Sequence, residues 1–129
     1  GYIHAIAHSL GGQYGTPHGL ANAVIMPYVL KAYGQSAYKK LHKLAVVAGI
    51  SNEGETHKIG AEKFIKAIEQ LNAKMQIPDK LTGIREEDIS IMAKHAEKEA
   101  HPLYPVPKLM TRKELENFYY EIADWSESK

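Results

Sequence analysis

The chain has 129 residues, of which 44% are hydrophobic and 24% charged, and this suits one globular domain with a core of its own. Its net charge of +1 excludes strong attraction to nucleic acid, and no apolar run is long enough to span a membrane or to serve as a signal peptide. The chain has no cysteine, which excludes disulfides and thiolate metal sites and fits a cytoplasmic protein. Because it begins with Gly1 and not Met, we expect a piece of a longer protein.

Turn residues divide the chain into about six predicted helices. The first covers 2–10 and is expected to end at Gly11-Gly12, because consecutive glycines stop a helix. Thr16 and Pro17 are expected to be the N-cap and the first residue of the second helix. That helix is apolar nearly all round, so it must be buried.

The later helices show apolar residues at helical spacing between turn residues. Pro27 is expected to kink the second helix, and Thr111 with Glu114 predicts a capping box for the last one. The segment 101–107 holds three prolines and cannot be helical. No alternating strand pattern competes, so the fold class is all-α, a helical bundle. The expected helices after the first cover 18–32, 36–48, 56–76, 85–100 and a segment that begins at Thr111.

The residues that carry chemistry lie in the first 21 positions, GYIHAIAHSLGGQYGTPHGLA. His4 and His8 are four apart and share a helix face. A chain reversal at the glycines can bring His18 back beside His4. Converging imidazoles suit a divalent cation such as Fe²⁺ or Zn²⁺. The first carboxylate of the chain is Glu53, however, and imidazoles alone would leave a dication poorly neutralised. The acid must come from the far end of this chain or from outside it.

The histidines of the chain also have interpretations without a function. His42, His57 and His95 lie among lysines and glutamates on predicted helix surfaces, and we interpret them as solvated residues without function. A plain helical domain, with the first three histidines purely structural, is a further hypothesis. It is disfavoured because burial of the second helix would carry them into an interior cleft, where unpaired imidazoles are costly.

The segment HAIAHSLGG, followed by TPHG and NAVIMP, resembles the histidine signature of the iron-containing NAD(P)-dependent alcohol dehydrogenases. The tail motif YPVPK at 104–108 is similar to the end of these enzymes, and the likeness runs over essentially the whole chain. The resemblance implies that 1–129 form a single all-α metal-binding domain like the C-terminal helical domain of the related dehydroquinate synthases. In this family a dinucleotide-binding, Rossmann-like domain precedes the helical domain and would be its partner.

The resemblance also implies roles for single residues. Family members bind the metal with one Asp and three His, in the cleft between their two domains. His4 and His18 match two of these ligands, while the Asp and the remaining His lie upstream in the family. His8 matches a histidine near the nicotinamide and the substrate, so it is the expected catalytic and cofactor-binding residue. His101 stands where an Asn is expected, and either alters the fit of the substrate or is an exposed loop residue.

The activity implied by the resemblance is the oxidation of an alcohol to an aldehyde or ketone, or the reverse, in a homo-oligomeric parent enzyme with Fe²⁺ or Zn²⁺ and NAD or NADP. The isolated chain is expected to be inactive and to bind metal weakly. It is also expected to bind NAD(P) poorly, because no glycine-rich phosphate cradle follows a strand. The alternative is a free-standing all-α metal-binding or interaction module that has lost catalysis.

Overall fold

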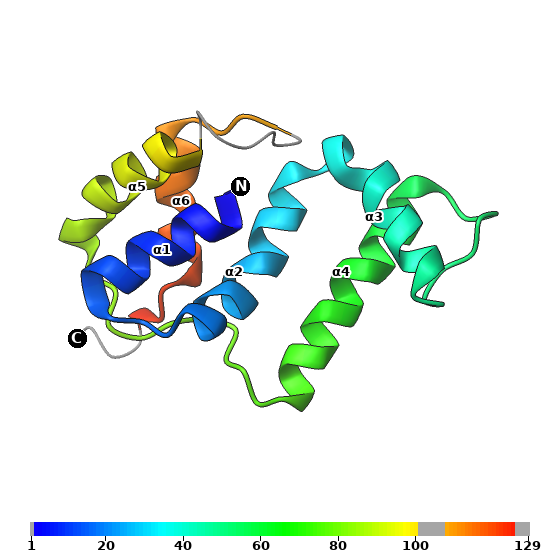
Figure 1. Cartoon of the computed structure of the whole chain (residues 1–129), viewed down its shortest axis with the longest axis horizontal. Helices are drawn as coiled ribbons and strands as arrows, with labels where there is room; N and C mark the ends of the chain where they lie inside the picture. Colours follow the sequence, from blue (N-terminus) through cyan, green and yellow to red (C-terminus); the bar gives the residue numbers. More distant parts are fainter. Residues whose placement is uncertain (1, 101–107, 126–129) are drawn as a thin grey trace.

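The computed structural model describes residues 2–100 and 108–125, and this part of the chain consists of helices joined by loops (Figure 1). The predicted all-α class is confirmed. Within the described residues, extended pairing is limited to one bridge between Leu81 and Ala123, and no helix has the length and apolar character needed to cross a bilayer. The helices are α1 (Tyr2–Tyr14), α2 (His18–Tyr33), α3 (Gln35–Val47), α4 (His57–Lys74), α5 (Glu86–Ala100) and α6 (Arg112–Ile122).

The helices form two parts that α2 joins. Helices α1, α5 and α6 pack together on one side, while α3 and α4 form a hairpin on the other (Figure 1). Helix α2 contacts members of both groups, which explains why it is apolar nearly all round. Its first turn lies beside α1, so the ends of α1 and α2 that carry the first histidines belong to the same side of the molecule.

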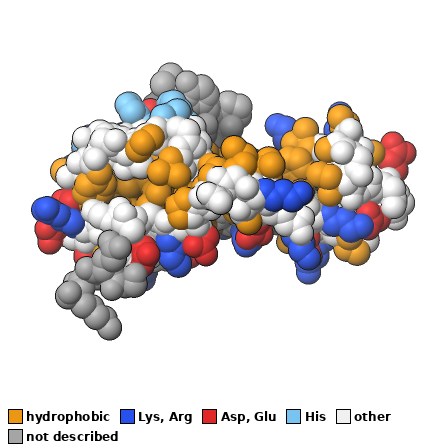
Figure 2. All heavy atoms as spheres, turned by 90° about the horizontal axis from the view of Figure 1, so that it is seen from below, with side chains coloured by type: hydrophobic (Ala, Val, Ile, Leu, Met, Phe, Trp, Pro, Cys, Tyr) orange, Lys and Arg blue, Asp and Glu red, His pale blue; other side chains and the backbone are white. Residues whose placement is uncertain are grey.

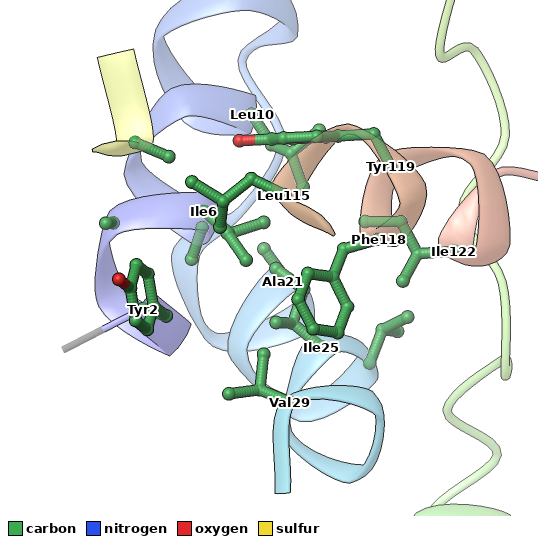
Figure 3. Packing of buried hydrophobic residues seen from close by; sticks show 14 of the residues in the cluster. Tyr2, Ile6, Leu10, Ala21, Ile25, Val29, Leu115, Phe118, Tyr119 and Ile122 are labelled. Carbon is green, nitrogen blue, oxygen red and sulfur yellow. The ribbon is translucent and has the colours of Figure 1, made fainter. Parts of the chain in front are cut away.

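The core lies where α1, α2 and α6 meet (Figure 3). Each helix contributes apolar side chains from one face, at the spacing of three or four residues that a helix requires. Complete burial of each large side chain stabilises the fold by roughly 1.5–3 kcal/mol. The side chains seen to converge are Tyr2, Ile6 and Leu10 from α1, Ala21, Ile25 and Val29 from α2, and Leu115, Phe118, Tyr119 and Ile122 from α6.

Helix α1 is longer than the sequence predicts, since it passes through Gly11-Gly12 and ends at Tyr14. The turn comes at Gly15, whose φ is +69°. Each internal glycine costs a helix only about 1 kcal/mol, and tertiary contacts of the last turn offset this. The Tyr14 hydroxyl donates to the Asp88 carboxylate at 2.8 Å and accepts the backbone N–H of Arg85 at 3.0 Å.

Helix α2 begins at His18, where the predicted range 18–32 begins, but its N-cap is Pro17, with an extended ψ of 133°, and not Thr16 as predicted. Pro27 lies inside the helix, as expected. It has no N–H to donate to the carbonyl of Ala23, four residues earlier. Asn72 of α4 makes good this loss, because its side-chain amide donates to the Ala23 carbonyl at 2.9 Å. The proline therefore creates a polar docking point between α2 and α4.

The prediction that His42 is solvated is wrong, since it is buried where α3 packs against α4, with 5% of its surface exposed. Its Nε2 lies 2.9 Å from the carbonyl oxygen of Asn52, and its Nδ1 lies 2.9 Å from Nδ1 of His57. His57 is exposed as predicted, yet it has this partner. Gly60 lies directly beneath the His42 ring, where no side chain would fit. Lysines are neighbours of His42 in the sequence, so the pattern suggests an exposed position and does not predict this close contact between the helices.

The predicted capping box of the last helix and the predicted apolar stripe of the fourth helix have different outcomes. The capping box at the start of α6 is confirmed, with the Thr111 side chain accepting the N–H of Glu114 and the Glu114 carboxylate accepting the N–H of Thr111. The apolar stripe of the fourth helix is only partly buried, since Leu71 and Met75 near its end are 56% and 62% exposed. Its first turns cover α3, whereas its last turns extend past it.

Candidate metal-binding and catalytic site

Three histidines converge at the surface formed by the start of α1 and the start of α2. His4 and His8 lie on one face of α1, and their rings stack with centroids 6.0 Å apart. His18, in the first turn of α2, meets His4 edge-on with centroids 5.3 Å apart. The predicted reversal that brings His18 beside His4 is therefore confirmed. Figure 2 shows histidine side chains together at the surface of this side of the molecule.

These histidines do not lie in an interior cleft, so that part of the sequence-based reasoning is wrong for this chain. The side chains of His4 and His8 are 54% and 67% exposed, and His18 is exposed as well. The buried faces of α1 and α2 carry apolar residues only, and the histidines project from the opposite side. Burial alone thus gives no argument for or against a function of the imidazoles.

The spacing of His4 and His18 suits a shared cation. Two imidazoles bound to one tetrahedral ion at about 2.1 Å have ring centroids roughly 5 Å apart, which agrees with the observed 5.3 Å. Two ligands are only half of a tetrahedral set. Within the described residues, no group of three or more His, Cys, Asp or Glu is arranged so that it could hold a metal ion. The donor set therefore fits a half-site for a divalent cation.

A carboxylate from the far end of the chain reaches this cluster. Glu99, in the last turn of α5, lies across α1 with both of its oxygens 2.9 Å from Nδ1 of His8. One oxygen is also 3.7 Å from Nε2 of His4, which is too long for a hydrogen bond. The sequence left the source of an acid open. The sequence pattern does not reveal Glu99, because 91 residues separate it from His8 and only the packing of α5 on α1 brings the two together.

A partly buried polar contact joins α1 to α6 at Ser9, the residue after His8. The Ser9 hydroxyl donates to the carbonyl of Ile6 at 2.7 Å and shares a hydrogen bond with the Tyr119 hydroxyl. Burial raises the pKa of Tyr119, and the nearby charge of Glu99 adds to this, while the Ser9 hydrogen bond works in the opposite direction. Tyr119 therefore stays protonated and ties α6 to α1 one residue along from His8.

A shallow groove of about 290 Å³ runs between α1 and α5 beside His8 and Glu99. His95 is exposed, as predicted, and lies on the wall of this groove. A larger cavity of about 430 Å³ lies between α2 and α4 and is lined by no histidine. Its Lys31 and Glu69 pair with each other at 3.1 Å. The groove at the histidines is therefore the better candidate for chemistry. His101 lies outside the described residues.

Comparison with known proteins identifies the family. The profile described as "Fe-containing alcohol dehydrogenase family, C-terminal" matches residues 1–123. The chain belongs to the iron-containing alcohol dehydrogenase family. Among its relatives, alcohol dehydrogenase 4 of Saccharomyces cerevisiae (strain ATCC 204508 / S288c) is 43% identical over 111 residues, which cover 82% of this chain and 28% of the yeast protein. The 1,3-propanediol dehydrogenase of Citrobacter freundii is 36% identical over 121 residues, 92% of this chain and 31% of that protein.

Solved structures of the same family share the fold. A crystal structure of 1,3-propanediol oxidoreductase superposes with a TM-score of 0.84 at 34% identity, over 95% of this chain and 32% of that one. An alcohol dehydrogenase from Oenococcus oeni gives a TM-score of 0.83 at 32% identity, with the same coverage. The chain thus spans less than a third of the length of these iron-containing alcohol dehydrogenase relatives.

Proposed function

We propose that this chain is the metal-binding helical part of an NAD(P)-dependent alcohol dehydrogenase that interconverts an alcohol and an aldehyde or ketone. The observation that carries the proposal is the convergence of His4 and His18 at a spacing suited to one shared cation. Family membership over residues 1–123 supports it. The relatives are more than three times as long as the region they share with the chain, so a dinucleotide-binding domain is proposed as the partner that completes the site.

In this proposal His4 and His18 supply two imidazole ligands to Fe²⁺ or Zn²⁺, and the remaining ligands come from outside the chain. A bound divalent cation supplies Lewis acidity, which lowers the pKa of an alcohol hydroxyl. NAD or NADP, held by the other domain, supplies the acceptor for hydride. Both histidines are exposed, which fits a metal site whose remaining ligands come from a second domain that faces them.

His8 is the proposed catalytic and nicotinamide-facing residue. It stands one helical turn from His4, with its ring stacked on that of His4, and its side chain is 67% exposed at the mouth of the groove. An imidazole in this place can accept the hydroxyl proton that leaves during alcohol oxidation and return it during reduction. The described residues hold no complete set of metal ligands. The isolated chain is therefore proposed to be inactive, and the complete enzyme is proposed to be a homo-oligomer.

Calorimetric titration of the purified chain tests the half-site, with Zn²⁺ in one series and Fe²⁺ under anaerobic conditions in another. We expect weak binding, with a Kd of about 1 μM or higher, that disappears in a His4→Ala/His18→Ala double variant. A His95→Ala variant is the matched control, because His95 is an exposed histidine outside the pair. Unchanged heats in the double variant would refute the assignment of His4 and His18.

A free-standing metal-binding module is the second candidate, and Glu99 is the observation that favours it. A carboxylate within 3.7 Å of His4 offers the acid that the first half of the chain lacks. Binding much tighter than micromolar that requires both His4 and Glu99 would support this module, because the chain would then complete a site by itself. A dinucleotide-binding domain encoded directly upstream would support the dehydrogenase instead.

A further inference from the structure

The contact between Glu99 and His8 determines which nitrogen of the imidazole carries the proton. Both carboxylate oxygens lie 2.9 Å from Nδ1 of His8. An ionised carboxylate has no proton to donate and only accepts hydrogen bonds. The Nδ1 atom must therefore be the N–H donor, and Nε2 of the neutral ring is left with a free lone pair. The hydrogen bond of one ring nitrogen sets the state of the other.

The position of Glu99 in its own helix is electrostatically unfavourable. It is the penultimate residue of α5, where the partial negative charge of the helix C-terminus repels a carboxylate. The contact with the exposed ring of His8 offsets this unfavourable position. Glu99 is itself less exposed, at 31%, than the ring it holds, at 67%, so the carboxylate is the more firmly packed member of the pair.

Contacts beside the pair join both α1 and α5 to α6. Ser9, next to His8, shares a hydrogen bond with Tyr119 of α6. Glu97, two residues before Glu99, accepts a hydrogen bond from Arg112 at the start of α6 at 2.9 Å. The helices that carry His8 and Glu99 are thus both tied to α6, while the direct packing of α5 on α1 brings the two side chains within reach of each other.

We propose that Glu99 is a positioning residue that holds His8 as the Nδ1–H tautomer, with Nε2 available to accept a proton from a bound alcohol. The catalytic consequence rests on the proposed function, whereas the tautomer does not. While it holds His8 in this way, Glu99 is not a third metal ligand, in accord with the incomplete donor set of the described residues. The pair follows a general pattern in which a carboxylate orients a functional histidine through its other nitrogen.

Long-range ¹H–¹⁵N spectra of the labelled chain test the assignment directly, at a pH of about 9, where imidazole rings are neutral, and with a chelator present. We expect a pyrrole-like Nδ1 and a pyridine-like Nε2 for His8. In Glu99→Ala the two signals should shift toward the average of two exchanging tautomers. In the matched control Glu97→Ala, which removes a carboxylate of the same helix that does not contact His8, the wild-type pattern should persist.

An Nε2–H tautomer in the wild-type chain, or identical His8 signals in wild type and Glu99→Ala, would overturn the proposal, and the wild-type spectrum decides this even if the variant folds poorly. A Zn²⁺ affinity that falls at least tenfold in Glu99→Ala but not in Glu97→Ala would also overturn it, because Glu99 would then be a metal ligand. If the wild-type chain bound no Zn²⁺ at His4 and His18 but His8 had the expected tautomer, only the proposed function would be refuted.

Discussion

Replacement of Gly60 by Ala should destabilise the fold, although the same change usually stabilises a helix. A Cβ atom at residue 60 would lie 2.1 Å from Cδ2 and 2.5 Å from Cγ of His42, whereas carbon atoms pack best at about 3.5–4.0 Å. The ring cannot rotate away freely, because it is buried and both of its nitrogens have partners at 2.9 Å. To make room, the α3–α4 contact must open or His42 must leave its site.

The magnitude follows from three contributions. Overpacking costs about 1–3 kcal/mol, and each hydrogen bond lost by His42 costs about 0.5–1.5 kcal/mol. The higher helix propensity of Ala returns at most about 1 kcal/mol. We therefore expect Gly60→Ala to lower the free energy of unfolding by roughly 3 kcal/mol. For a chain of this length, this corresponds to a fall in Tm of about 10 °C.

Urea unfolding followed by circular dichroism measures the effect as a change in the midpoint at constant slope. Gly12→Ala is the matched control, because Gly12 is also helical and no atom lies within 4 Å of its added Cβ. It should leave stability unchanged or raise it by up to about 1 kcal/mol. If Gly60→Ala raised the midpoint as Gly12→Ala does, the reasoning would be refuted. In a His42→Ala background most of the Gly60→Ala penalty should vanish, with a remainder from the Cβ of residue 42 at 2.9 Å.

Two further predictions concern other contacts of the α3–α4 hairpin. Asn72→Ala should destabilise the chain by about 1–3 kcal/mol, because it leaves the Ala23 carbonyl without the amide donor that Pro27 makes necessary; thermal melts should show almost no change for the exposed control Asn117→Ala. A hydrogen bond from the Lys63 ammonium, helped by those from the Ser51 hydroxyl and the Asn52 backbone, lowers the pKa of Glu55 from its ordinary value of 4.5 to about 2. Because the folded pKa is the lower one, this contribution is complete above about pH 4.5 and is lost as the pH falls toward 2. Urea midpoints of Glu55→Gln should therefore lie below those of wild type at neutral pH and converge with them near pH 2, and a constant difference at all pH values would contradict the linkage.

The sequence by itself determined the helices of the fold, the pairing of His4 with His8 and the return of His18 to the side of His4. Apolar periodicity and turn residues located every helix, and the Thr111 capping box was readable because it depends on neighbours three residues apart. The pairing of His4 with His8 follows from helical spacing alone. The family was also legible in the first 30 residues, since its histidine signature is contiguous in the chain.

Only the tertiary structure decided the contacts that join distant segments. The end of α1 lies beyond Gly11-Gly12 because Tyr14 gains partners in Asp88, in the first turn of α5, and Arg85, which precedes that helix. His42 is buried because α4 approaches it at Gly60.

Glu99 reaches His8 because α5 packs across α1. Local propensities act over a few residues and are worth about 1 kcal/mol each. They cannot encode a hydrogen bond between atoms 91 residues apart, which depends on the burial of whole helix faces.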